Sequence, residues 1–262
     1  MFFSLSSWAL ALILFAVIAG ACALGAVLGR ALRRRHETLR EPIGVLQGAL
    51  LGVVGLILAF GLTLAVGRYE SRRAAAVEEA NAIGTTYLRA QTLPEPARRQ
   101  SLALLRRYAD LALRITFEVP GSSEMRRIVA EENAVQRRLW NLAGQSLVAE
   151  PTANATRLYV DSLNSMIDQQ TVRIAGLNNR VPGAVLGLEV LGAAAALGLL
   201  SLYLSVLGRG HVAVVLAAGL VTMLLLVTFD LDRPARGLIK VPDTALQSVR
   251  DSMALPPAAN GP

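Results

Sequence analysis

The sequence predicts an all-α membrane protein, with four transmembrane helices in two hairpins and a helical cytoplasmic insert between spans two and three. Hydrophobic residues make up 53% of the 262 residues and charged residues only 17%, which is too apolar for an ordinary soluble domain. In addition, four apolar stretches each reach the roughly 20 residues that a helix needs to cross a bilayer. The rest of the chain has few strand signals and no internal repeat.

The four apolar stretches divide the chain into regions. The first resembles a signal peptide, but residues 1–7 carry no basic residue and the apolar run is longer than a usual signal core, so we expect a retained span. Residues 30–40 with Pro42, and residues 208–211, form short connections within two hairpins. The spans are expected at about residues 8–29, 43–67, 183–207 and 212–229. The expected domains are a first transmembrane hairpin (1–67), a helical extramembrane domain (68–182), a second hairpin (183–231) and a C-terminal tail (232–262).

Prolines divide the insert into four segments long enough for helices. The dividing positions are Pro94, Pro96, Pro120-Gly121, Pro151 and Pro182. Ser122 and Ser123 lie where an N-cap is expected, with Glu124 in the first turn. Since the first and last segments directly adjoin spans two and three, we expect them to extend those spans.

The charged and reactive residues exclude several function classes. The net charge of +7 comes from 25 Arg and one Lys against 19 acids, and the Arg are spread over the chain without a nucleic-acid-binding motif. Cys22 is the only cysteine, and His36 and His211 are too few for a histidine-built metal centre. No nucleophile–base set is evident. We therefore expect no enzyme activity, cofactor, metal site or nucleic-acid partner.

Basic residues near the membrane favour a cytoplasmic insert. Nine lie on the side of the insert and both chain ends, and six lie on the side of the two short connections. The positive-inside rule places the richer side in the cytoplasm. The dense run Arg33-Arg34-Arg35 argues for the opposite orientation.

Span two carries two different faces. Small residues recur along one of them, which lets helix backbones approach closely in lipid: Gly44, Gly48, Gly52 and Gly55. Bulky apolar residues recur along the other, and the candidate pore-neck residues are Val53, Ile57, Phe60 and Leu64. In one interpretation the small face packs inside a monomer and the bulky face meets lipid. In the other, copies of span two surround an axis and the bulky residues form a constriction that gates by dewetting.

Acidic residues in span three and at the end of span four form candidate ion or salt-bridge sites. Glu189 lies near the start of span three, and an ionisable group inside a span is a functional candidate. A side chain at this depth can also reach the headgroups or pair with an Arg. Asp230 and Asp232 end span four and are followed by Arg233, which favours an ion-paired collar over a calcium site.

Three stretches carry a resemblance to a known family. They are RYESRRAAAVEEANAIGTTYLRA after span two, NNRVP before span three and LDRPARGLIKVP after span four. Together they resemble the bacterial bestrophin-like family, a remote relative of bestrophins. This resemblance covers nearly the whole chain from about residue 43 to 249. Bestrophins are pentameric anion channels with four spans per subunit and a large cytoplasmic helical part.

The resemblance implies a role for span two. In bestrophins this span lines the pore, narrows at bulky apolar residues and continues into a charged cytoplasmic stretch. Phe60 followed by Arg68-Tyr69-Glu70 and Arg72 looks like that layout. Arg68, Arg72 and Arg73 would then concentrate anions in a water-filled vestibule. The acidic calcium-binding run of bestrophins is missing after Asp232.

Two function classes remain in competition. The first is an oligomeric, anion-selective channel of the bacterial inner membrane, whose partners are further copies of itself, the lipid bilayer and small inorganic ions. The resemblance alone suggests a pentamer. The second is a membrane-anchored sensory or scaffolding protein whose helical insert binds a partner. The short tail after Lys240 leaves little room for the signalling domain that such receptors normally add.

Overall fold

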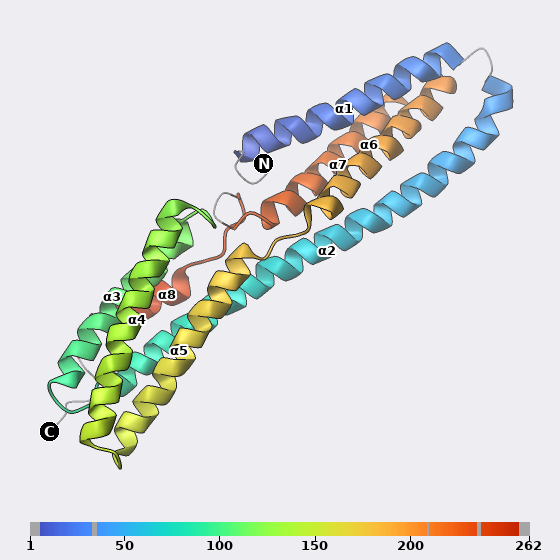
Figure 1. Cartoon of the computed structure of the whole chain (residues 1–262). Helices are drawn as coiled ribbons and strands as arrows, with labels where there is room; N and C mark the ends of the chain where they lie inside the picture. The colour runs from blue at the N-terminus through green and yellow to red at the C-terminus, as the bar shows by residue number, and fades with distance from the viewer. Residues whose placement is uncertain (1–5, 33–35, 209, 235–236, 257–262) are drawn as a thin grey trace. The chain divides into compact units, whose positions relative to one another are not determined.

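The structure, a computed structural model, describes residues 6–32, 36–208, 210–234 and 237–256, and over these residues its regular elements are α-helices (Figure 1). They are α1 (Ser7–Leu32), α2 (His36–Ala90), α3 (Ala97–Phe117), α4 (Ser123–Ala149), α5 (Asn154–Asn178), α6 (Gly183–Val206), α7 (His211–Leu231) and α8 (Thr244–Ser252). Four stretches are long and apolar enough to cross a membrane, and they contain α1, α2, α6 and α7. The predictions of an all-helical chain and of four candidate spans are confirmed over the described residues.

The chain forms two compact units, which we describe separately. Unit 1 comprises residues 1–68 and 180–239, and unit 2 comprises residues 69–179 and 240–262. Unit 1 thus contains α1, α6, α7 and the apolar part of α2. Unit 2 contains the polar part of α2 together with α3, α4, α5 and α8.

In unit 1, the closest helix contact is between α1 and α6. A Cβ atom at Gly25 of α1 would collide with the carbonyl oxygen of Gly198, and one at Gly29 would lie 2.5 Å from the carbonyl oxygen of Leu202. The Ser201 hydroxyl of α6 donates a hydrogen bond of 2.7 Å to the backbone carbonyl of Cys22. Small residues give this close approach in lipid, where no hydrophobic force drives helices together. The sequence analysis expected such a contact in span two and missed this one.

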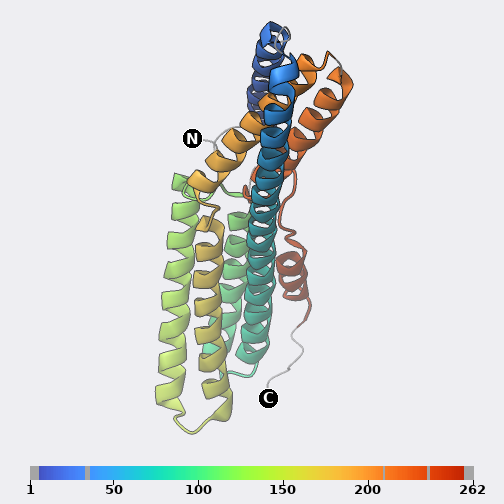
Figure 2. The ribbon, with the colours of Figure 1, turned by 90° about the vertical axis from the view of Figure 1, so that its right-hand side faces the viewer.

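Unit 2 is a helical bundle around an apolar core. The polar part of α2 forms this bundle together with α3, α4 and α5 (Figures 1 and 2), in which α4 packs against α3 and α5. Its core side chains are fully buried and include Ile83, Leu105, Tyr108, Leu139 and Leu163. On each helix the core residues recur every three or four positions, as expected for amphipathic helices.

The C-terminal tail contains a helix that the sequence analysis did not predict. Leu246 of α8 and Met253 after it are buried in the core of unit 2. The Tyr87 hydroxyl donates a hydrogen bond of 3.1 Å to the carbonyl of Met253. Gly84 of α2 faces this helix, since a Cβ there would lie 3.6 Å from the Val249 side chain. The segment from Leu246 to Met253 therefore packs as part of the bundle.

Most helix ends in the insert follow the predicted prolines and cap. The Ser122 hydroxyl accepts a hydrogen bond of 3.0 Å from the backbone N–H of Met125, which confirms the expected N-cap. The last segment does not extend span three, because α5 ends at Asn178 and α6 begins after Pro182. Proline disfavours a helical conformation in the residue before it, and this separates the two helices.

The connection between the first two spans is shorter than expected. Helix α1 runs to Leu32 and α2 begins at His36, so Pro42 lies inside α2 and not in the connection. It lies in the second turn, where it removes one backbone hydrogen bond without ending the helix. Gly208 and Gly210, with φ of 72° and 92°, supply the left-handed backbone of the other connection.

Candidate functional site

The apolar part of α2 packs one face against α6. Val54, Leu58, Gly61 and Ala65 are buried and recur every three or four residues. A Cβ at Gly192 of α6 would lie 3.3 Å from the Val54 side chain, so the backbone of α6 comes close to α2 there. This contact leaves the opposite side of α2 without a covering helix.

The predicted neck residues lie on the uncovered side of α2. Val53, Phe60 and Leu64 expose 57%, 61% and 46% of their surface, and Ile57 is half-buried. Large apolar side chains at this exposure need lipid or another protein surface beside them. Within one chain, they are therefore free to meet lipid or to line a space between copies.

The small-residue ridge of α2 is largely open as well. A Cβ at Gly44 would lie 3.2 Å from the Tyr203 ring of α6, so this glycine packs inside the chain. A Cβ at Gly48, Gly52 or Gly55 would meet no atom within 4 Å. Within one chain, therefore, Gly44 is the one of these four glycines that packs against another helix.

The three basic residues after the apolar part of α2 have different surroundings. Arg68 is half-buried, and the exposed Arg73 lies 3.8 Å from the Glu70 carboxylate. Arg72 exposes only 3% of its surface, and a Cβ at Gly176 of α5 would lie 3.9 Å from its Cγ. Within one chain Arg72 thus lies on the inward face of the bundle, unlike the exposed Arg73.

Glu189 of α6 is buried against α2. The side chain has no exposed surface, and a Cβ at Gly61 would collide with its carboxyl group. Among the described residues neither carboxyl oxygen has a hydrogen-bond partner. Glu189 therefore forms no pair with an Arg among the described residues.

Asp230 and Asp232 bind backbone groups around the end of α7. Asp230 accepts hydrogen bonds of 2.8 Å from the Ile239 N–H and 3.3 Å from the Ser7 hydroxyl. Asp232 accepts one of 3.0 Å from the Val181 N–H, and Arg233 beside it is buried. No group of three or more metal-ligating side chains occurs in the described part of the chain. The hydrogen bonds of Asp230 and Asp232 connect the segments flanking α6 and α7.

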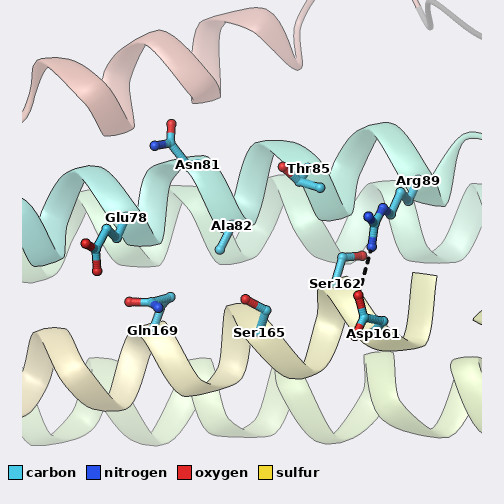
Figure 3. Close-up of a pocket in the computed structure, with 9 residues that line it drawn as sticks. All are labelled: Glu78, Asn81, Ala82, Thr85, Arg89, Asp161, Ser162, Ser165 and Gln169. Atoms are coloured by element: carbon cyan, nitrogen blue, oxygen red, sulfur yellow. Dashed lines mark hydrogen bonds and ion pairs between the residues drawn. The ribbon is translucent and has the colours of Figure 1, made fainter. Parts of the chain in front are cut away.

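Unit 2 carries a polar groove between α2 and α5 (Figure 3). The groove has a volume of about 350 Å³ and is open to solvent. Arg89 closes one end through its contact of 3.3 Å with Asp161, and Glu78 lies at the other end. The lining residues are Glu78, Asn81, Ala82, Thr85, Arg89, Asp161, Ser162, Ser165 and Gln169. Hydroxyl and amide groups of this kind can bind a polar molecule or a hydrated ion.

A buried polar network crosses the core of unit 2. The Arg173 guanidinium of α5 lies 2.5 Å from the Glu79 carboxylate of α2 and donates hydrogen bonds to Thr116 and to the Ala112 carbonyl. The Gln170 amide donates a hydrogen bond of 2.8 Å to Glu132 of α4. These contacts connect four helices of the bundle through polar side chains.

Burial shifts the protonation of this network. Loss of solvent, together with the nearby Glu79 charge, raises the pKa of Glu132 to about 8. The same two causes raise the pKa of Tyr108 well above its usual value. The sequence analysis missed Glu79, Glu132 and Arg173. Their only sequence signal is a polar residue at a core position of an amphipathic helix, such as Glu132 between Ile128 and Val135.

Comparison with known proteins places this arrangement in a family. The chain matches the model of the Bestrophin-like domain over residues 9–246. A crystal structure of a bacterial bestrophin homologue from Klebsiella pneumoniae, carrying one mutation, matches with a TM-score of 0.68 at 15% identity, over 90% of this chain and 97% of that one. Another structure described as a bacterial bestrophin homologue from this organism gives 0.67 at 15% identity over the same shares. No curated protein sequence matches. The structural likeness shows a common fold, and the domain match over most of the residues shows that the chain belongs to the Bestrophin-like family.

Proposed function

We propose that the protein is one subunit of an oligomeric, anion-selective ion channel in which the apolar part of α2 lines the pore. The uncovered bulky face of α2 carries this proposal. Copies arranged around an axis would bring Val53, Ile57, Phe60 and Leu64 together as a neck. A narrow ring of such side chains disfavours water and blocks ions by dewetting. Membership of the Bestrophin-like family supports the channel class.

The assembly and its orientation form part of the same proposal. The open ridge at Gly48, Gly52 and Gly55 would pack between neighbouring subunits, and the family resemblance favours five of them. The four spans would cross the bacterial inner membrane as two hairpins, with unit 2 in the cytoplasm. Arg68 and Arg73 would then supply positive potential at the cytoplasmic end of the pore.

A membrane-anchored sensory protein is the second candidate. The polar groove between α2 and α5 favours it, because a solvent-open groove with hydroxyl, amide and carboxylate groups suits a small polar ligand. In that case α2 would serve as a contact between subunits, without a conducting pore.

Bilayer recordings of the reconstituted protein separate the two candidates. Replacing Ile57 and Phe60 by Ala widens and wets the neck, so we expect a larger conductance than in the parent. The matched control is Leu216→Ala with Leu220→Ala on α7, two residues that are 68% and 71% exposed. Arg68→Gln with Arg73→Gln should weaken anion preference, and less so at 1 M salt, where the Debye length is about 3 Å. Absence of protein-dependent current from the parent and from all variants would favour the sensory candidate.

A further inference from the structure

Glu189 is the one acidic or basic residue within the four apolar runs. Residues 8–29, 43–67, 183–207 and 212–229 contain no other acidic or basic side chain. It is the seventh residue of α6, which places it about 9 Å along the helix from Gly183. A carboxyl group at that depth is costly in lipid and calls for a specific environment.

The environment of Glu189 is a notch in α2. Gly61 has no side chain, and a Cβ at this position would collide with the Glu189 carboxyl group. Before and after Gly61 on the same face, Leu58 and Ala65 are buried and apolar. Helix α2 therefore accommodates the carboxyl group by shape, and offers it no side-chain donor at the notch.

No charge in unit 1 compensates Glu189 inside the spans. The apolar runs of α1, α2 and α7 contain one titratable side chain, the thiol of Cys22. Cys22 lies beside Ser201, about 18 Å along α6 from Glu189. Asp230, just beyond the run of α7, is occupied by the Ile239 N–H and the Ser7 hydroxyl. Arg68 is the basic residue of α2 closest in sequence to the notch, two turns or about 10 Å beyond Gly61.

A carboxylate without a partner cannot stay in such a place. Burying an uncompensated charge costs far more than burying the neutral acid, so the group in the notch is the protonated form. If it releases its proton to water, the carboxylate must leave the notch for a donor or for the membrane edge. Arg68 lies in that direction on α2, so the movement would alter the packing of α6 against α2.

We propose that Glu189 and the Gly61 notch form a proton-binding site that couples the protonation of Glu189 to the packing of α2 against α6. The site takes up one proton as its ligand. Its effect on ion flow rests on the proposed function, because it acts through the helix assigned to the pore. The binding of the proton itself does not depend on conduction.

Infrared difference spectroscopy of the purified protein tests the proton site directly. The spectrum of the parent minus that of Glu189→Gln at pH 7 should contain the carbonyl band of a protonated carboxyl group. On raising the pH this band should give way to carboxylate bands. Carboxylate bands alone at pH 7 would overturn the proposal. Glu150→Gln, which changes an exposed carboxyl group, serves as the control and should yield only carboxylate bands.

A double-mutant cycle tests the coupling to α2. Gly61→Ala should lower the melting temperature by roughly 2 to 12 °C, since the added methyl group meets the carboxyl group. In a Glu189→Ala background the same substitution should have almost no effect. Gly67→Ala is the matched control in α2, because a Cβ there meets no atom within 4 Å. Equal loss from Gly61→Ala in both backgrounds would contradict the coupling.

The pH dependence of the current distinguishes failure of the site from failure of the channel. In the parent, conductance should change over the pH range in which the infrared band titrates, and Glu189→Gln should remove that change. If the infrared band titrates but no variant gives a current, the proton site is supported and the proposed channel function is contradicted. Current whose pH dependence persists in Glu189→Gln contradicts the coupling to ion flow.

Discussion

Units 1 and 2 both bury acidic side chains, and they surround them in opposite ways. In unit 2, Glu79 lies against Arg173, and Glu132 receives a hydrogen bond from Gln170. In unit 1, Glu189 lies in a glycine notch, and neither of its oxygens has a hydrogen-bond partner among the described residues. The amphipathic helices of unit 2 can place polar residues at core positions, whereas the apolar runs of unit 1 contain no other charge to offer.

This difference separates two ways of tolerating a buried acid. A pair of opposite charges can remain ionised in a protein core if the geometry is good and further hydrogen bonds satisfy the donors. A lone acid must stay neutral, and its position then depends on pH. Unit 2 therefore uses the buried pair of Glu79 and Arg173 for cohesion, and we infer that unit 1 uses its buried acid as a titratable contact.

Removing the cation of the pair in unit 2 should have the largest effect. Arg173→Met leaves Glu79 buried without its partner and should lower the free energy of unfolding by roughly 3 to 5 kcal/mol. Fluorescence of Trp140 in a Trp8→Phe background follows the unfolding of unit 2 specifically, since the chain has only two tryptophans. Arg89→Met, in the exposed pair with Asp161, is the control and should cost less than about 1 kcal/mol. Similar losses from both variants would show that burial does not govern the pair.

Glu132 should make the stability of unit 2 depend on pH. Its pKa in the fold is about 8 against an ordinary value of 4.5, so between these values the fold holds a proton that the unfolded chain has released. Stability should therefore fall as the pH rises through this range, by up to about 4 kcal/mol between pH 5 and pH 8. In Glu132→Gln the slope should be smaller, and the variant should exceed the parent in stability at pH 8. If stability, followed by Trp140 fluorescence, depends on pH in Glu132→Gln as it does in the parent, the titrating group lies elsewhere.

Packing in unit 1 should show a smaller effect that depends on position. Gly25→Leu forces α1 away from the Gly198 backbone and should cost about 1 to 3 kcal/mol of stability, measured by Trp8 fluorescence in a Trp140→Phe background. A Cβ at Gly48 would meet no atom within 4 Å, so Gly48→Leu should leave that melting curve unchanged. If the ridge packs between subunits, Gly48→Leu should instead reduce the yield of assembled oligomer in size-exclusion chromatography. An assembled yield equal to that of the parent would mean that this ridge faces lipid.

The length of apolar runs and the positions of prolines were sufficient to predict the spans and the helices of the insert. These are local properties, since a span depends on the number of consecutive apolar residues and a helix end on the residue that breaks it. The exposure of a single side chain could not be predicted where it depends on contacts with residues distant in sequence. Arg72 looked like Arg73 in sequence, yet one lies against α5 and the other is exposed.

The candidate site was predictable only in part for the same reason. The bulky residues of α2 could be assigned to one face from helical spacing alone. The notch that holds Glu189 depends on Gly61, more than a hundred residues earlier, and the network around Glu132 combines side chains from several helices. The close approach of Gly25 to Gly198 likewise depends on which helices become neighbours.

Cysteine modification during bilayer recording tests most directly the claim that the uncovered face of α2 lines the pore. In a Cys22→Ser background, a charged methanethiosulfonate reagent is applied to channels carrying Phe60→Cys, and to channels carrying Leu220→Cys on exposed α7. We predict that the reagent alters the current irreversibly for Phe60→Cys, because a thiol at the neck meets water when the pore conducts. For Leu220→Cys we predict no change, because a thiol in lipid stays protonated and unreactive. A current that is insensitive at Phe60→Cys and sensitive at Leu220→Cys would place the pore along α7 and contradict the account.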